Sequence, residues 1–257
     1  MNRDKFAEPF GNSYFHQIGL GLIPGHRRIV GLGNNPSVDT TTTPEDITSA
    51  GGLYTFMDAA APLELLSDNA ADTAAGTGAR TITVVGLDAN YKEANQVVTL
   101  NGLTPVAVPA PLLRVNRLVI ASAGSNKTNV GTITCRRVSD ALGQRTMPAG
   151  FGVSRASMYT VPAGFTLSVN QYFASINRTG GTARSASMIT MHQTTTGILF
   201  SPFEFTVESS APMFFESLPG TIITEKMDFW LRCQSVSTNG TNVTAAWLGV
   251  LVDNSYL

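Results

Sequence analysis

The side chains best suited to covalent catalysis or to metal binding are few in this chain and far apart. The histidines are His16, His26 and His192, and the cysteines are Cys135 and Cys233. A nucleophile usually needs a base within hydrogen-bond reach, and the histidine and cysteine ligands of zinc usually occur in closely spaced pairs. These positions suggest neither arrangement. The sequence therefore predicts a protein that is not an enzyme and that holds no metal ion.

Three glycine-containing segments resemble known catalytic or nucleotide-binding motifs, but each lacks an essential part. Residues 31–36 (GLGNNP) lack the third glycine of a dinucleotide-binding loop, and a proline followed by threonines is a poor helix start. Residues 76–80 (GTGAR) lack the lysine of a phosphate-binding loop. Residues 152–156 (GVSRA) lack the final glycine of a nucleophile elbow. These glycines are better interpreted as tight turns, and no cofactor is predicted.

Carboxylates leave two alternatives open. Asp68, Asp72 and Asp88 supply hard oxygen ligands for a surface calcium ion, although their spacing matches no EF-hand loop. A carboxylate pair for glycoside hydrolysis is not excluded by the sequence, but no glutamate stands out as a partner in one. Aspartates in solvated turns are the simpler interpretation of all three positions.

The elements that must position these side chains are predicted to be almost entirely β-strands. Short runs of valine, isoleucine, threonine and phenylalanine are separated by glycine, asparagine, proline and serine. Such residues favour a pleated, half-buried surface, and regularly spaced short strands are typical of sandwiches and barrels. The predicted strands cover residues 79–87, 96–101, 113–121, 129–136, 165–173, 187–193, 198–207, 228–236 and 243–252. Residues 62–66 predict either a helical turn or a short strand.

The expected fold is all-β: a jelly-roll-like β-sandwich with little helix and an extended N-terminal arm. Residues 51–257 form the sandwich body, which is divisible near residues 140–155 if it contains two domains. The last two strands flank an Asn239-Gly240 turn signal and predict a hairpin. Trp230 and Trp247 lie on the two strands of that hairpin, where they would anchor the core or a subunit interface.

Residues 1–50 differ from the rest of the chain and are predicted to form the arm. Glycine, proline and asparagine recur between residues 18 and 35, and the segment 43–45 (TPE) predicts one helical turn. A short extended segment cannot bury its own apolar side chains, so these cover either the same subunit or a neighbour, and we expect the neighbour. The apolar residues proposed for this subunit interface are Phe6, Phe10, Tyr14, Phe15, Ile18, Leu20, Leu22 and Ile23.

The composition suits a protein that buries surface against other proteins. Hydrophobic residues make up 43% of the chain and charged residues 14%, against about 25% charged residues in an average soluble domain. The formal net charge of −1 gives no reason to expect nucleic-acid binding. The charges form segments of alternating sign, which would either set the register between subunits or neutralise one another within one molecule. The basic residues proposed for a subunit interface are Arg114, Arg117, Arg136 and Arg137.

The cysteine usage and the hydropathy indicate where the protein folds. Two cysteines inside predicted strands are too few for a disulfide framework, and the start of the chain resembles no export signal. No apolar run approaches the ~20 residues that span a bilayer. We therefore expect reduced, buried cysteines, folding in a cytosol, and no membrane partner.

An ordered set of short strings resembles a group of structural proteins from the virions of tailed bacteriophages. The strings are residues 23–39 (IPGHRRIVGLGNNPSVD), 51–56 (GGLYTF), 75–82 (AGTGARTI), 86–91 (GLDANY), 98–102 (VTLNG), 113–117 (LRVNR) and 159–164 (YTVPAG). The likeness covers roughly residues 20–170. It implies location in a virion, with folding in the host bacterial cytoplasm, and it supplies no catalytic residues.

These observations lead to three functional expectations. The first is a virion protein, a homotrimer that decorates or cements a phage capsid and contacts the major capsid protein. The second is a tail-associated subunit of a collar, nozzle, baseplate or fibre attachment. The third is a module that binds host glycans through exposed aromatic residues, for which the candidates are Tyr54, Tyr91, Tyr159 and Tyr172.

Overall fold

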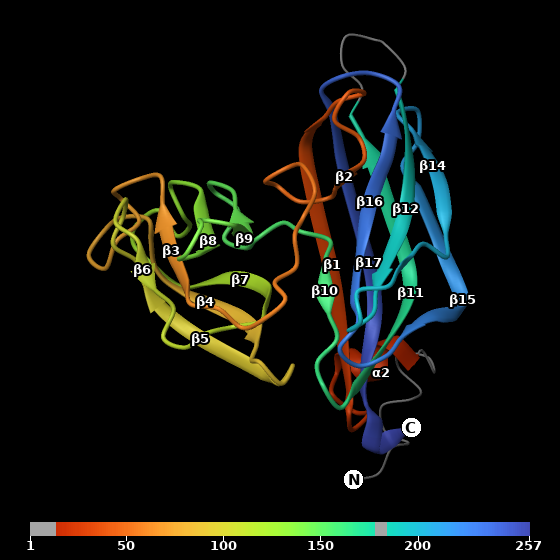
Figure 1. The fold of residues 1–257 in the computed structure, drawn as a ribbon, viewed down its shortest axis with the longest axis horizontal. Helices are drawn as coiled ribbons and strands as arrows, with labels where there is room; N and C mark the ends of the chain where they lie inside the picture. Colours follow the sequence, from red (N-terminus) through yellow and green to blue (C-terminus); the bar gives the residue numbers. More distant parts are fainter. Residues whose placement is uncertain (1–13, 178–183) are drawn as a thin grey trace.

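The computed structural model describes residues 14–177 and 184–257 and shows two β-rich bodies, each with its own core (Figure 1). The larger body is a tall sandwich of two sheets. The smaller body lies beside it, and its core residues come from positions 57–147. A short helix, α2 (Tyr14–Gly19), and a 3-10 turn, η1 (Asn254–Tyr256), complete the described elements.

Antiparallel strands form both sheets of the sandwich. The first sheet has the order β1-β17-β11-β15. Its strands are β1 (His26–Val38), β17 (Thr241–Asp253), β11 (Phe165–Ile176) and β15 (Met213–Ile223). The second sheet has the order β10-β16-β12-β13, with β14 also paired to β12 and β2 also paired to β16. Its strands are β2 (Glu45–Asp46), β10 (Tyr159–Thr160), β12 (Ser185–Gln193), β13 (Leu199–Phe200), β14 (Glu204–Glu208) and β16 (Asp228–Val236).

The strand order of the sandwich is that of a jelly roll. β2 and β10 are both short and both pair with β16, so they occupy one strand position between them. β13 and β14 both pair with β12 and likewise share one position. Counted in this way along the chain, the first sheet holds positions one, eight, three and six. The second sheet holds positions two, seven, four and five. This double Greek-key arrangement confirms the predicted all-β, jelly-roll-like sandwich.

The sandwich core is filled by large side chains that alternate inward along the strands. Trp247, Phe229 and Tyr172 are at most 2% exposed, and the rings of Phe229 and Trp247 meet edge to face with centroids 5.2 Å apart. Edge-to-face pairs add stabilisation beyond the burial of their area. Trp230 is also buried, but it packs in a separate cluster with Ala156. Both tryptophans therefore anchor buried clusters of their own chain.

The smaller body is a domain inserted into one strand position of the sandwich. The chain leaves after β2 and returns at β10, and core residues from Met57 to Met147 pack together in the insert. The insert has sheets of order β6-β3-β8-β9 and β5-β4-β7. Its strands are β3 (Leu63–Ser67), β4 (Ala79–Leu87), β5 (Glu93–Thr99), β6 (Val106–Ala107), β7 (Arg114–Ala123), β8 (Ile133–Arg137) and β9 (Gly143–Met147).

Residues 26–38 are a strand of the sandwich and not part of an extended arm. β1 pairs with β17 from His26 to Val38, and two glycines make this possible. A Cβ on Gly31 would lie 2.2 Å from the Trp247 ring, and one on Gly33 would lie 2.2 Å from the Ile47 carbonyl oxygen. The glycines that resembled a loop in the sequence therefore allow the close approach of neighbouring groups.

Two further local expectations were wrong. β16 and β17 do not form a hairpin, because β16 pairs with β12 in the second sheet and β17 pairs with β1 and β11 in the first. The Asn239-Gly240 turn instead carries the chain from one sheet to the other. Residues 43–45 do not start a helical turn, because Glu45 begins strand β2 against β16.

Candidate assembly interface

The four basic residues expected at a subunit interface all have partners within the chain. Arg136 pairs with Glu64 at 2.8 Å, and Arg137 pairs with Asp140 three residues away. Arg117 donates to the carbonyl oxygen of Val30, and Arg114 pairs with Asp228. Intramolecular neutralisation, the alternative left open by the charge pattern, thus describes the contacts of Arg114, Arg136 and Arg137. Their use between subunits remains a proposal.

Arg114 and Asp228 form a buried joint between the insert and the sandwich. The guanidinium donates from Nε and Nη2 to the two carboxylate oxygens, both at 2.9 Å, and from Nη1 to the carbonyl oxygens of Met57 and Leu113. The exposed fractions of the two side chains are 8% and 3%. Two parallel hydrogen bonds fix the orientation as well as the distance of the pair, and Thr160 donates a further hydrogen bond to Asp228.

Neighbouring contacts make the joint rigid. The side-chain amide of Asn116 in the insert donates to the carbonyl oxygen of Thr160 and accepts from its backbone N–H. The guanidinium of Arg114 also lies 5.0 Å from the centroid of the Phe56 ring, within the range of a cation–π contact. The insert and the sandwich are therefore held in one fixed arrangement.

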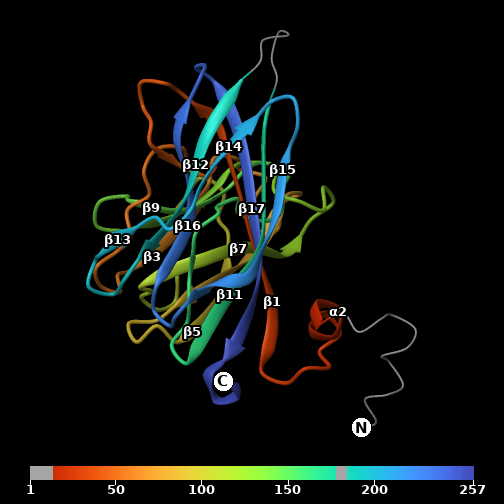
Figure 2. The same cartoon turned by 90° about the vertical axis from the view of Figure 1, so that its right-hand side faces the viewer.

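The described part of the proposed arm packs on its own sandwich. Ile18 is buried in a cluster with Val250 and Val252, and Phe15 and Ile23 pack against that cluster. Figure 2 shows α2 lying on the outer face of the first sheet. Among the remaining arm residues, Tyr14 and Leu20 are exposed, Leu22 is half-buried, and Phe6 and Phe10 lie outside the described residues.

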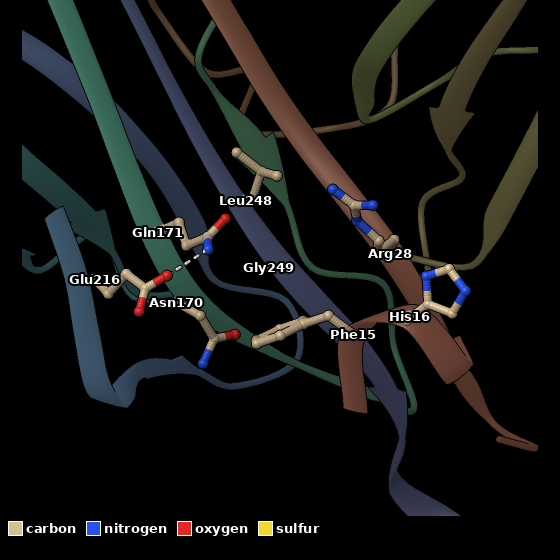
Figure 3. Close-up of a pocket in the computed structure, with 8 residues that line it drawn as sticks. All are labelled: Phe15, His16, Arg28, Asn170, Gln171, Glu216, Leu248 and Gly249. Carbon is tan, nitrogen blue, oxygen red and sulfur yellow. Dashed lines mark hydrogen bonds between the residues drawn. The ribbon is translucent and has the colours of Figure 1, made fainter. Parts of the chain in front are cut away.

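A cleft of about 490 Å³ lies between α2 and the outer face of the first sheet (Figure 3). We call it the α2 cleft. It is lined by Phe15, His16, Arg28, Asn170, Gln171, Glu216, Leu248 and Gly249. Phe15 and Leu248 give the cleft an apolar part, and Gln171 donates to Glu216 at 2.8 Å on one side. Arg28 forms no ion pair with any described residue. The cleft thus combines a small apolar part with the cation of Arg28 and the carboxylate of Glu216.

The most exposed apolar segment of the described chain is on the other side of the sandwich. Ile198, Leu199, Phe200 and Phe203 are 62%, 55%, 43% and 41% exposed. We call residues 198–203 the apolar flap; it includes β13, which pairs with the end of β12. Sequence reasoning took this segment for an ordinary strand, although the Ser201-Pro202 pair within it was a signal of an edge. Clustered exposed apolar residues of this kind mark interaction surfaces.

No metal-binding cluster is present among the described residues. No group of three or more histidine, cysteine, aspartate or glutamate side chains in the described ranges could hold a metal ion. Cys135 and Cys233 are free and buried, and burial raises the pKa of each thiol to about 12. Both are therefore protonated near neutral pH and are poor nucleophiles. Within residues 14–177 and 184–257, no helix has the length and hydropathy of a membrane span.

The tyrosines considered for glycan binding do not form an exposed aromatic surface. Tyr172 is buried, and Tyr54, Tyr91 and Tyr159 are half-buried. Tyr54 donates from its hydroxyl to Gln144 at 2.8 Å, while Tyr172 stacks on Phe215 in the sandwich core. These side chains contribute to packing, so the described residues give no support to a glycan-binding module.

His192 is predicted to destabilise the fold as the pH falls from about 6.5 to about 4. Its ring packs against Phe200 and Phe229, its Nε2 atom has no hydrogen-bond partner, and burial lowers its pKa to about 4. Between the unfolded pKa of about 6.5 and this value, only the unfolded chain binds the proton, so acid favours unfolding. The free energy of unfolding should fall by about 2 kcal/mol from pH 7 to 4.5 through this group.

The variant His192→Phe isolates this effect. Urea denaturation of both proteins across the pH range should show that the variant loses less stability than the wild type, with the difference developing between pH 6.5 and 4. His16 and His26 are present in both proteins and cancel in the comparison. Parallel pH profiles would show that His192 does not titrate with this shift.

No family model matches the chain, and no curated protein matches its sequence. Solved structures that match the chain include chains of infectious bursal disease virus. A chain of the Gt strain is 12% identical with a TM-score of 0.25, and the match covers 95% of this chain and 79% of that one. A chain of the Gx strain is 10% identical with a TM-score of 0.26 and coverages of 90% and 73%. A chain of the VP2 subviral particle is 10% identical with a TM-score of 0.21 and coverages of 91% and 73%.

Proposed function

We propose that this chain is a non-enzymatic structural protein of a tailed-bacteriophage virion, and that it decorates or cements the capsid. The observation that carries the proposal is the combination of a rigid jelly-roll body with a solvent-exposed apolar flap on a charge-poor surface. Jelly rolls recur in viral capsid proteins and lectins, and the exposed flap favours a protein that is buried against others. The resemblance of residues 20–170 to phage virion proteins gives the same direction.

Two features of the chain supply the proposed contacts. The apolar flap and the exposed arm residues Tyr14 and Leu20 offer surface for burial, at roughly 25 cal/mol per Å² of apolar area removed from water. The partners are other copies of the chain, as a homotrimer, and the major capsid protein of the same particle.

The number of copies per particle tests the proposal. Virions produced from the genome that encodes this chain would be purified, and the chain would be quantified by mass spectrometry against isotope-labelled peptides. Symmetric shells contain many copies of each component, so a decorating protein is expected at about a hundred copies or more. A count of about a dozen or fewer would instead indicate the tail-associated role. Absence of the chain from the particles would contradict both.

A further inference from the structure

We propose that the apolar flap of one molecule docks into the α2 cleft of a second copy of this chain. This inference rests on the proposed function, because it names the surfaces through which a virion component would join its own copies. The two surfaces lie on opposite sides of the same sandwich: β13 is in the second sheet, and the cleft lies on the outer face of the first (Figure 2). A molecule cannot join them to each other, but two molecules can.

The flap has the composition of an inserting segment. Four of its six residues are large and apolar, and no other six consecutive described residues contain four exposed large hydrophobic side chains. Proline at position 202 and the short pairing of β13 limit its growth into a longer strand. Glu204 follows the flap directly and is also exposed. The apolar flap therefore carries a carboxylate directly at its C-terminal end.

The α2 cleft has the complementary chemistry. Its volume of about 490 Å³ falls within the range of about 300–1,000 Å³ that is usual for binding pockets. Phe15 and Leu248 provide apolar contacts, and Arg28 provides a cation that forms no ion pair with a described residue. Glu216 also lines the cleft, but it accepts a hydrogen bond from Gln171 and lies on the opposite side from Arg28 (Figure 3). An apolar segment with an adjoining carboxylate satisfies both parts, with Glu204 of one copy placed against Arg28 of the next.

The negative charge around the flap argues against contact between the flaps of two molecules. Residues 185–208, which form the strands around the flap, contain two glutamates, Glu204 and Glu208, and no lysine or arginine. Like charges would repel two flaps from one another, whereas the cation in the cleft attracts the flap of a neighbour. The contact is consequently head-to-tail, which closes into a ring when the rotation between copies allows it.

Substitutions on the two surfaces test the contact in the full-length protein. The wild type is expected to form oligomers whose mass is measured by light scattering after size exclusion. Leu199→Asp in the flap and Arg28→Glu in the cleft should each weaken self-association by at least about 30-fold, the loss typical of a central interface residue. Leu103→Asp is the matched control, since Leu103 is 60% exposed on the insert, and it should leave the mass unchanged.

Two combinations distinguish docking from a general effect of the substitutions. Arg28→Glu joined with Glu204→Arg in one chain should restore association, because the charges are exchanged. Mixing the Leu199→Asp and Arg28→Glu proteins should give a heterodimer, since one intact flap then meets one intact cleft. Circular dichroism and thermal unfolding should show that each variant is folded.

A monomeric wild type at high concentration would overturn the inference, and so would oligomers of unchanged mass in the flap and cleft variants. Either result leaves the proposed function standing if the chain is found in virions. Conversely, head-to-tail oligomers of a chain that is absent from virions would support the contact and contradict the proposed function.

Discussion

Replacing Arg114 by methionine is expected to destabilise the folded protein by about 4 kcal/mol. The substitution keeps much of the aliphatic length of the side chain but leaves the Asp228 carboxylate buried without its cation. Among the described side chains, Thr160 alone would still donate a hydrogen bond to Asp228. Breaking a buried ion pair by removing one partner is costly because the remaining charge is uncompensated. Denaturation in urea, followed by tryptophan fluorescence, measures the loss.

Two further variants show whether the loss comes from the buried ion pair. Arg137→Met removes an ion pair with Asp140 on the surface and should lower the free energy of unfolding far less than Arg114→Met, because solvent screens an exposed pair. The double variant Arg114→Met/Asp228→Leu should recover a large part of the loss, because it removes the buried charge together with its partner. A loss below about 1 kcal/mol in Arg114→Met would show that the pair is not the joint between the two bodies.

Replacing Gly33 by alanine is expected to destabilise the sandwich by about 3 kcal/mol. The added Cβ would lie 2.2 Å from the Ile47 carbonyl oxygen and 2.7 Å from the Ser157 backbone nitrogen. Both are backbone atoms that cannot move aside by a change of rotamer, so β1 or the neighbouring segment must shift. Thermal unfolding should show a clearly lowered midpoint for this variant.

Gly143→Ala is the matched control for this substitution. Gly143 is also in a strand, and a Cβ placed there meets no atom within 4 Å. Its midpoint should stay close to that of the wild type, since substitutions that create no clash usually change stability by about 0.5 kcal/mol or less. Equal midpoints for both variants would contradict the placement of β1 in the sandwich.

The strands that sequence reasoning located have a strong local signal. The predicted strand at residues 79–87 coincides with β4, and those at 228–236 and 243–252 lie in β16 and β17. In each, β-branched and aromatic residues fill inward positions and the alternation is visible in the sequence alone. β1 lacked this signal because glycine is unfavourable in an isolated strand. Its glycines leave room for the Trp247 ring and the Ile47 carbonyl group, which a local sequence pattern does not reveal.

The inserted domain could not be located from local patterns. The strand position that it interrupts consists of β2 and β10, each of two residues, separated by more than a hundred residues of chain. Neither pair has enough residues for a period, and their shared partner β16 is known only from the folded chain. The same limit explains the wrong hairpin, since a turn signal fixes a reversal of the chain but not the sheet that each strand joins.

The candidate interface was predicted only in part. Apolar residues near the start of the chain indicated a contact, but their spacing did not tell that Ile18 would pack on Val250 of the same chain. The charge pattern placed Arg114 near acidic segments without identifying Asp228 as its partner. Exposure of the flap depends on which residues cover β12 and β14 in space, and a run such as ILFSPF reads the same whether it is buried or exposed.

Asymmetric electron cryo-microscopy of the intact virion is the most direct test that this chain is an assembly component. The account predicts density for the jelly roll and its insert on the particle, in rings or arrays of copies. Contacts between those copies should join the apolar flap of one molecule to the α2 cleft of the next. Intact particles that lack this density would contradict the account.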